Sequence, residues 1–194
     1  MQIERTVCGV TTLGPGSRMA VWVNGCPRRC KGCVSPLLQR PEPRNERDID
    51  EYFSRFDYAS IDGVTISGGE PFMQTEELAR LVRFLKKRGV EDILVYTGYT
   101  IEELRARGDE YTDYVLSAIA VLIDGPYVEE KNTDIGNLMG SDNQRVIFLS
   151  DKFKRPYADY ADDKRSMQIF GLGNIELAVG IPDKEFVKNF KKAI

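Results

Sequence analysis

The sequence contains no histidine, and this absence removes several classes of catalytic and metal site. Without an imidazole, the chain has no Ser-His-Asp or Cys-His triad, no HExxH zinc motif and no metal centre with a histidine ligand. Any catalysis must therefore depend on carboxylates, lysine, tyrosine, cysteine or a bound cofactor.

The sequence also lacks a long apolar run. Residues 115–123 form the longest candidate, and this is well short of the roughly 20 residues that span a bilayer. The N-terminal segment Met1-Gln2-Ile3-Glu4-Arg5 has no apolar stretch typical of a secretory signal. We therefore expect a cytoplasmic protein with no membrane partner. Cytosolic thiols stay reduced, so clustered cysteines in such a chain indicate metal or redox chemistry rather than disulfides.

The composition is that of an ordinary folded domain. The chain has 194 residues, of which 42% are hydrophobic and 29% are charged. A domain of this length buries enough surface to fold without disulfides. The formal net charge of −3 argues against a general nucleic-acid binder.

Short apolar segments alternate with helical patterns along the chain. The sequence predicts strands at 19–24, 63–67, 92–96 and 120–124, separated by helices at 48–56, 75–88, 101–106 and 111–118. This order is typical of parallel βαβ units and predicts an α/β fold. The carboxyl ends of parallel strands meet at one edge of a sheet, where we expect ligands to bind.

The pattern changes after residue 149. A further strand at 145–149 completes what we expect to be a core domain of residues 1–149. Residues 150–194 form a predicted C-terminal α+β extension packed on that core. Within it, the sequence predicts a hairpin of residues 167–170 and 175–179, and a final helix at 182–194.

Three of the four cysteines lie close together in a C-x3-C-x2-C pattern formed by Cys26, Cys30 and Cys33. Thiolates are soft ligands that suit zinc or iron–sulfur clusters. Three ligands on one loop leave the fourth position of a four-iron cluster open for a substrate or cofactor. The alternative is a structural zinc site with Cys8 as fourth ligand, although zinc ligands usually come in two pairs and Cys8 is isolated.

Two loops that follow predicted strands complete the candidate site. In Ser67-Gly68-Gly69-Glu70-Pro71, paired glycines allow a ligand to approach the backbone closely, and the Glu70 carboxylate is able to receive an ammonium group. A tight turn with a solvated glutamate is the simpler interpretation of this segment. Tyr96-Thr97-Gly98-Tyr99-Thr100 offers a hydroxyl and an aromatic ring to a cofactor, or it caps the helix that follows.

Taken together and in order, these segments resemble the radical S-adenosylmethionine superfamily, and within it the activating enzymes of anaerobic ribonucleotide reductases. The carrying residues are Gly14-Pro15-Gly16-Ser17-Arg18, Trp22-Val23-Asn24-Gly25-Cys26-Pro27, Cys30-Lys31-Gly32-Cys33, Ser67-Gly68-Gly69-Glu70-Pro71, Tyr96-Thr97-Gly98-Tyr99 with Glu102-Glu103-Leu104, Val121-Leu122-Ile123-Asp124-Gly125, and Gly140-Ser141 with Asn143-Gln144. Two features depart from the superfamily. Gly32 stands where many members have an aromatic residue, and residues 150–194 extend beyond the compact activating enzymes.

The resemblance implies a [4Fe–4S] cluster held by Cys26, Cys30 and Cys33, with S-adenosylmethionine bound at the open iron. It implies that Ser67, Gly68, Gly69 and Glu70 lie along the methionine part of that cofactor, with Glu70 near its amino group. Thr97 and Tyr99 become candidates for contacts to its ribose or carboxylate. Reductive cleavage would give a 5′-deoxyadenosyl radical that abstracts a hydrogen atom, a reaction that needs no general base and therefore no histidine.

The resemblance further implies an incomplete radical S-adenosylmethionine β/α barrel and a protein substrate. That substrate would be a glycyl-radical enzyme, one glycine of which loses its α-hydrogen, and an electron donor such as flavodoxin or ferredoxin would reduce the cluster. Two other functions stay open. One is a radical maturase of a peptide or small molecule, with a pocket shaped by residues 150–194, and the other is a non-catalytic zinc or iron–sulfur binding module.

Overall fold

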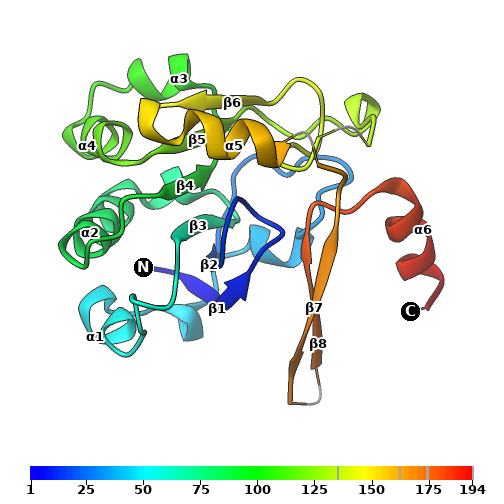
Figure 1. Ribbon diagram of the computed structural model, residues 1–194, viewed down its shortest axis with the longest axis horizontal. Helices are drawn as coiled ribbons and strands as arrows, with labels where there is room; N and C mark the ends of the chain where they lie inside the picture. Colours follow the sequence, from blue (N-terminus) through cyan, green and yellow to red (C-terminus); the bar gives the residue numbers. More distant parts are fainter. Residues whose placement is uncertain (135, 162, 174, 194) are drawn as a thin grey trace.

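The computed structural model describes residues 1–134, 136–161, 163–173 and 175–193 (Figure 1). The strands are β1 (Ile3–Val10), β2 (Arg18–Val23), β3 (Gly63–Gly68), β4 (Ile93–Tyr96), β5 (Val121–Asp124), β6 (Arg145–Phe148), β7 (Met167–Leu172) and β8 (Ile175–Gly180). The α-helices are α1 (Ile49–Ser54), α2 (Thr75–Lys87), α3 (Ile101–Arg105), α4 (Glu110–Ala118), α5 (Lys154–Ala161) and α6 (Lys184–Ala193). Short 3-10 turns are η1 (Pro36–Gln39), η2 (Pro43–Asn45), η3 (Pro71–Gln74), η4 (Glu129–Lys131) and η5 (Asp151–Phe153). Residue 194, the end of the predicted last helix, lies outside the described residues.

In the described residues, strands β1 to β6 form a sheet in sequence order, and β7 and β8 form a separate antiparallel hairpin. Strands β2, β3, β4 and β5 are parallel, in a register that pairs Met19 with Val64 and Thr65 with Leu94. The predicted parallel βαβ units are thus confirmed. The edge strands β1 and β6 are antiparallel to their neighbours. For β6 the reason is the connection from β5, whose described residues form only η4 and no α-helix to carry the chain back across the sheet.

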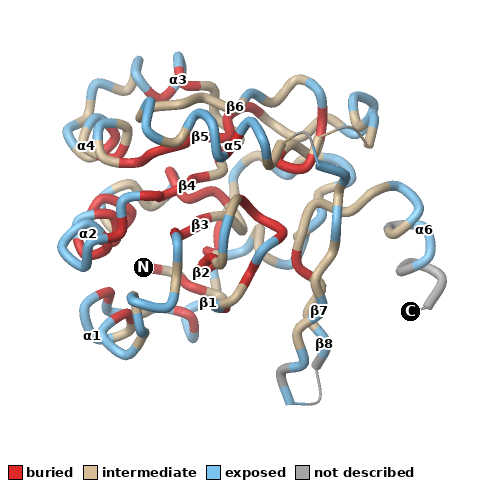
Figure 2. The backbone as a smooth tube through the Cα atoms, viewed as in Figure 1, coloured by how far each residue is buried: buried red, intermediate tan, exposed pale blue. Residues whose placement is uncertain are grey.

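Helices α1 to α4 pack in one cluster on one face of the sheet, with α1, α2 and α4 on the left and α3 at the top in Figure 1. The predicted apolar face of α2 is confirmed, because Leu78, Leu81, Val82 and Leu85 are all fully buried there. They pack in one cluster with alternate side chains of the strands, among them Ile66. In Figure 2 the buried residues of α2 and of the central strands are coloured red. Burial of each such side chain contributes about 1.5–3 kcal/mol, so this layer is a main source of stability.

The opposite face of the sheet is covered by residues that follow β6. Helix α5 places Tyr157 in a cluster with Leu94 and Ile123, whose side chains alternate with those of the first layer. The hairpin packs Val179 against Val10 and Leu13 at the β1 edge. The sequence did not predict α5, because residues 151–165 are mostly polar and Tyr157 is its one fully buried side chain in the described residues. The closure of the sheet into an incomplete barrel stays a prediction.

A buried ion pair holds the amino-terminal ends of the strands. Arg18, the first residue of β2, is fully buried and donates to Thr65 Oγ1 at 2.7 Å and to Asp92 Oδ2 at 2.7 Å. The Tyr157 hydroxyl donates to the other oxygen of Asp92 at 2.7 Å. This network occupies the end of the sheet opposite the candidate site, so Arg18 of the Gly14–Arg18 segment serves the fold.

In the described part of the chain, no helix is both long enough and apolar enough to cross a membrane.

Candidate functional site

The three clustered cysteines lie on a loop of residues 26–33, here called the cysteine loop, which directly follows β2. All three thiols are free and partly exposed. The loop begins with two backbone hydrogen bonds to η1, from Gly25 N–H to Leu38 O at 2.8 Å and from Cys26 N–H to Gln39 O at 3.0 Å. The cysteine loop is therefore fixed at its base, and its thiols are partly exposed.

The donor set of the cysteine loop suits a soft metal group. Burial raises the pKa of the Cys26 thiol, and the backbone N–H groups of Arg28 and Arg29 oppose this rise because they stabilise the thiolate. Within the described residues, no group of three or more His, Cys, Asp or Glu side chains is placed so that it could hold a metal ion. The cysteine loop fits an iron–sulfur cluster by its thiol chemistry and its spacing. Its three sulfur atoms do not already surround one common point.

Gly32 has a structural reason for standing next to the last cysteine. Its φ of 70° lies in the left-handed region, and a Cβ atom would lie 2.8 Å from Glu129 Oε1 on η4. Lys31 pairs with the same segment, at 3.2 Å from Glu129 and 3.1 Å from Glu130. The left-handed backbone therefore favours glycine over an aromatic residue here, and the Glu129 side chain lies over the position.

The Ser67–Glu70 segment packs its backbone directly on the base of the cysteine loop. Glu70 N–H donates to Gly25 O at 2.7 Å, and Gly69 N–H donates to Val23 O at 2.7 Å. A Cβ on Gly69 would lie 2.3 Å from Gly25 O, and one on Gly68 would lie 2.4 Å from Val23 N. The paired glycines are thus required by the contact between two backbones, whatever ligand they also approach.

The Glu70 carboxylate joins the loops that follow β3 and β4. Its Oε1 atom accepts from Phe72 N–H at 3.0 Å and from the Thr97 hydroxyl at 2.8 Å. Its Oε2 atom accepts from Gly98 N–H at 2.7 Å. Glu70 is only 1% exposed, and burial raises the pKa of its carboxyl group, while these three donors and the nearby Arg28 oppose the rise. We call Glu70, Thr97 and Gly98 the Glu70 shelf.

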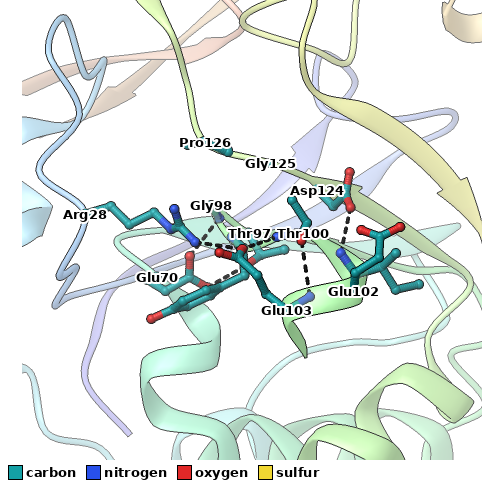
Figure 3. A network of polar contacts seen from close by, with 12 residues as sticks. Arg28, Glu70, Thr97, Gly98, Thr100, Glu102, Glu103, Asp124, Gly125 and Pro126 are labelled. Atoms are coloured by element: carbon teal, nitrogen blue, oxygen red, sulfur yellow. Dashed lines mark hydrogen bonds and ion pairs between the residues drawn. The ribbon is translucent and has the colours of Figure 1, made fainter. Parts of the chain in front are cut away.

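Arg28 connects the cysteine loop to the Glu70 shelf (Figure 3). Its guanidinium stacks on the Tyr99 ring with 4.4 Å to the ring centroid, and it donates to Glu103 Oε2 at 3.0 Å. The Arg28 side chain also covers Gly98, where a Cβ would lie 2.6 Å from Arg28 Cδ. A second guanidinium, that of Arg107, lies 4.3 Å from the same Tyr99 centroid. Sequence reasoning did not select either arginine, because a charged residue on a loop gives no signal of its partner.

Asp124 anchors the neighbouring loop after β5. Its carboxylate is fully buried and accepts from Ile101 N–H at 2.7 Å and from Arg145 Nε at 2.9 Å. Arg145 also pairs with Glu102 at 2.6 Å and lowers the pKa of that carboxyl group to about 2. The Asp124 side chain is thus committed to holding the start of α3, next to the Thr97–Tyr99 loop.

The structure brings the predicted site residues together at one edge of the sheet. Cys26, Glu70 and Thr97 lie on adjoining loops that are joined by the hydrogen bonds above. Tyr99 lies against Arg28 of the cysteine loop. Two shallow surface depressions lie instead at the opposite end of the sheet, around Asp92 and Phe153, and contain none of these residues. The chemical groups, rather than a surface hollow, therefore define the candidate site.

Comparisons with known proteins show the family to which the chain is similar. A family model described as a 4Fe-4S single cluster domain matches residues 12–147. The chain is 34% identical over 140 residues to the anaerobic ribonucleoside-triphosphate reductase-activating protein of Enterobacteria phage T4, covering 69% of this chain and 85% of that protein. It is 30% identical over 144 residues to the protein of that name from Escherichia coli K12, covering 70% of this chain and 91% of the relative. It is also 30% identical over 187 residues to the pyruvate formate-lyase-activating enzyme of Staphylococcus aureus, covering 86% of this chain and 74% of the relative.

Proposed function

The chain belongs to the 4Fe-4S single cluster domain family and, with its relatives, to the radical S-adenosylmethionine activating enzymes, and from this premise we propose its reaction. The protein holds a [4Fe–4S] cluster through Cys26, Cys30 and Cys33. It cleaves S-adenosylmethionine and thereby generates a glycyl radical on a partner enzyme of the anaerobic ribonucleotide reductase type. The observation that carries the proposal is a loop of three free thiols whose base is hydrogen-bonded to the Ser67–Glu70 segment.

The thiols of the cysteine loop supply three ligands to a four-iron cluster, which leaves one iron without a protein ligand. A cluster held there would supply the electron for reductive cleavage of a carbon–sulfur bond of S-adenosylmethionine, which would yield methionine and a 5′-deoxyadenosyl radical. Arg28 and Lys31 hold the cysteine loop from two sides, through Glu103 and through the acidic η4 turn. The protein therefore contributes ligation and a fixed loop, and the cofactor contributes the electron chemistry.

The Ser67–Glu70 segment binds the methionine part of S-adenosylmethionine. Its backbone contact with Gly25 supports this, because it places the segment beside the base of the cysteine loop that would hold the cluster. The Glu70 carboxylate adds negative charge beside the cofactor's amino group and fixes the Thr97–Tyr99 loop. Thr97 and Tyr99 contact the ribose or the carboxylate. Glu70 is thus a buried negative charge beneath the ligand and a positioning group between two loops.

The substrate hydrogen is the α-hydrogen of a glycine in the partner protein. The sheet leaves its carboxyl-terminal edge to loops, through which a partner segment reaches the radical. The chain's residues orient the groups and exclude water, and no general base is needed in the absence of histidine. The electron donor is a protein of the flavodoxin or ferredoxin type, and the reaction takes place in the cytoplasm under anaerobic conditions.

The test is anaerobic reconstitution of the wild-type protein and of two matched cysteine variants. Cys30→Ser removes one proposed ligand, whereas Cys8→Ser removes an exposed thiol on β1 outside the site. We expect about four irons per chain in the wild-type protein and in Cys8→Ser, and loss of the cluster in Cys30→Ser. A bound zinc ion, or a cluster that survives Cys30→Ser, would contradict the ligand assignment.

The same preparation tests the substrate. Incubation with S-adenosylmethionine, dithionite and an anaerobic ribonucleotide reductase should give a glycyl-radical doublet by electron paramagnetic resonance. Cleavage of S-adenosylmethionine without a radical on any glycyl-radical enzyme of the host would favour a maturase that acts on another peptide or small molecule. If the protein carries a full cluster but cleaves no S-adenosylmethionine, the remaining hypothesis is a non-catalytic binding module.

A further inference from the structure

One arginine that follows β6 in the sequence has its charge buried against the connection between β5 and β6. The side chain of Arg165, which lies between α5 and β7, is only 3% exposed. Its guanidinium donates to oxygen atoms that include Asn132 Oδ1 at 2.9 Å, Asp134 Oδ1 at 3.3 Å, Gly136 O at 3.0 Å, Met139 O at 2.7 Å and Pro182 O at 3.2 Å. A buried charge is costly unless it is well paired, so these contacts make Arg165 the centre of the local structure.

All of these oxygen atoms except that of Pro182 belong to one loop. We call this loop the β5–β6 connection, and the structure describes its residues 125–134 and 136–144. Its two arms are bonded to each other, because Asp142 N–H donates to Lys131 O at 2.9 Å and Val128 N–H donates to Ser141 Oγ at 3.1 Å. A guanidinium that holds the middle of this loop therefore also fixes the acidic turn η4 on its first arm.

The β5–β6 connection contacts two loops of the candidate site. On η4, the Glu129 carboxylate lies 3.2 Å from the ammonium group of Lys31, which stands between the last two cysteines of the cysteine loop. At the start of the connection, Gly125 N–H donates to Tyr99 O at 2.9 Å. One intervening segment therefore links Arg165 to the cysteine loop.

We propose that Arg165 is a positioning residue for the cysteine loop, an inference that rests on the proposed function. Arg165 holds the β5–β6 connection in the position at which η4 meets Lys31, and it thereby limits the movement of Cys30 and Cys33. Its role is indirect, because the contacts run through the β5–β6 connection. The residues that follow β6 thus help to prepare the loop that would receive the cluster.

The geometry requires a guanidinium and not merely a positive charge. A guanidinium presents five N–H groups in fixed directions, so it is able to hold several carbonyl oxygens at once, whereas a lysine ammonium is a compact charge with three donors on a flexible stem. Arg165→Lys therefore keeps the charge and loses part of the hydrogen bonds, and Arg165→Met loses both. A positioning role predicts an intermediate effect for Arg165→Lys.

Gln168 on β7 provides a matched control, because it attaches the residues that follow β6 to the other edge of the sheet. Its side-chain oxygen accepts from Thr11 N–H at 3.0 Å, and its side-chain nitrogen donates to Gly9 O at 2.9 Å. Gln168→Met removes these two hydrogen bonds and changes no group that the Arg165 contacts above involve. A general loosening of the residues that follow β6 would therefore appear in this variant as well.

The test measures how fast the thiols of the cluster-free protein are alkylated, which does not depend on any cofactor chemistry. Each protein is treated with iodoacetamide at one pH, and the modification of Cys30, Cys33 and Cys8 is followed by peptide mass spectrometry. Cys8 lies on β1 and is the internal reference. Thermal unfolding of the same samples shows whether each variant is folded at the assay temperature. In a second arm, the loss of iron from the cluster-loaded proteins to a chelator is followed.

We expect Arg165→Met to raise the alkylation rates of Cys30 and Cys33 about fivefold relative to that of Cys8, and Arg165→Lys to raise them about twofold. Gln168→Met should leave both relative rates as in the wild-type protein. The loss of iron should quicken in the same order of variants.

Unchanged relative alkylation in a folded Arg165→Met protein would overturn the proposal. An equal increase in Gln168→Met would also overturn it, because the cause would then be general loosening. Wild-type rates in Arg165→Lys would mean that charge alone matters. Where Arg165→Met is unfolded at the assay temperature, Arg165→Lys must still exceed Gln168→Met, or the proposal fails. If the alkylation order holds but the wild-type protein cleaves no S-adenosylmethionine, the proposed function fails and the positioning of the loop stands.

Discussion

The Glu70 carboxylate is the most informative single group to change, because it is buried and its two oxygens serve three donors. In Glu70→Gln the amide has one oxygen, which is able to keep the bonds from Phe72 N–H and the Thr97 hydroxyl. The amide NH2 group then faces Gly98 N–H at the former 2.7 Å distance, and two donors oppose each other. One buried N–H without an acceptor costs about 1–3 kcal/mol.

We therefore expect Glu70→Gln to lower the free energy of unfolding by about 2 kcal/mol, or the melting temperature by roughly 4–8 °C for a chain of this length. Thr97→Val removes one of the same hydrogen bonds and should cost about 1 kcal/mol. Because both variants act on one network, the double variant should lose less than the sum. Glu176→Gln, an exposed change on β8, is the control and should have no effect.

The assay is anaerobic thermal unfolding of the cluster-loaded protein, with S-adenosylmethionine affinity measured on the same samples. We expect Glu70→Gln to weaken that affinity without loss of iron, because the shelf moves and the cysteines do not. Strict additivity of Glu70→Gln and Thr97→Val would refute the coupling of the two loops. A Glu70→Gln protein as stable as wild type would refute the burial argument itself.

Three further predictions follow from other contacts. Arg28→Gln should speed the loss of iron to a chelator about tenfold, since it removes the stacking and ion pair that hold the cysteine loop, while the exposed neighbour variant Arg29→Gln should not. Tyr157→Phe should lower the free energy of unfolding by about 1.5–3 kcal/mol in urea titrations, because its hydroxyl donates to the buried carboxylate of Asp92; an effect below about 0.5 kcal/mol would contradict this role. The carboxyl pKa of Glu102 is about 2, below its ordinary value of 4.5, so its ion pair stabilises the fold above pH 4.5 and is lost as the pH falls toward 2. The stability difference between Glu102→Gln and wild type should therefore vanish across that interval, and a difference that persists at pH 2 would contradict the ion pair.

The sheet and its helices were predictable from local patterns. The helix at 75–88 matches α2 within one residue, because its apolar face has the helical period and Gly89 ends it. The strand at 63–67 matches β3 because a run of small and β-branched residues enters a glycine turn. Residues that are neighbours in the sequence determine such elements, so a single sequence is enough to predict them.

The convergence of the site loops was also predictable, since parallel strands place their carboxyl ends together. The side-chain contacts between those loops were not predictable. The contacts of Arg28 with Tyr99 and Glu103 join residues more than seventy positions apart, and no spacing rule links them. The inward direction of the Glu70 carboxylate was not predictable either, because the sequence suggested that this carboxylate accepts a ligand.

The C-terminal region shows why composition alone misleads. Residues 151–165 are mostly polar, yet α5 forms there and buries Tyr157 against Arg18 and Asp92. The aromatic ring of Tyr157 is buried, and its hydroxyl donates to a buried ion pair. This contribution to stability depends on partners that are distant in the sequence. The division into a core of residues 1–149 and an extension of residues 150–194 stays a prediction.

The most direct test of the account is the fate of S-adenosylmethionine on the anaerobically reconstituted, dithionite-reduced protein. We expect methionine and 5′-deoxyadenosine in equal amounts, and neither product from a protein lacking any one of Cys26, Cys30 and Cys33. A protein with its full complement of iron that binds the cofactor and leaves it intact would contradict the central claim.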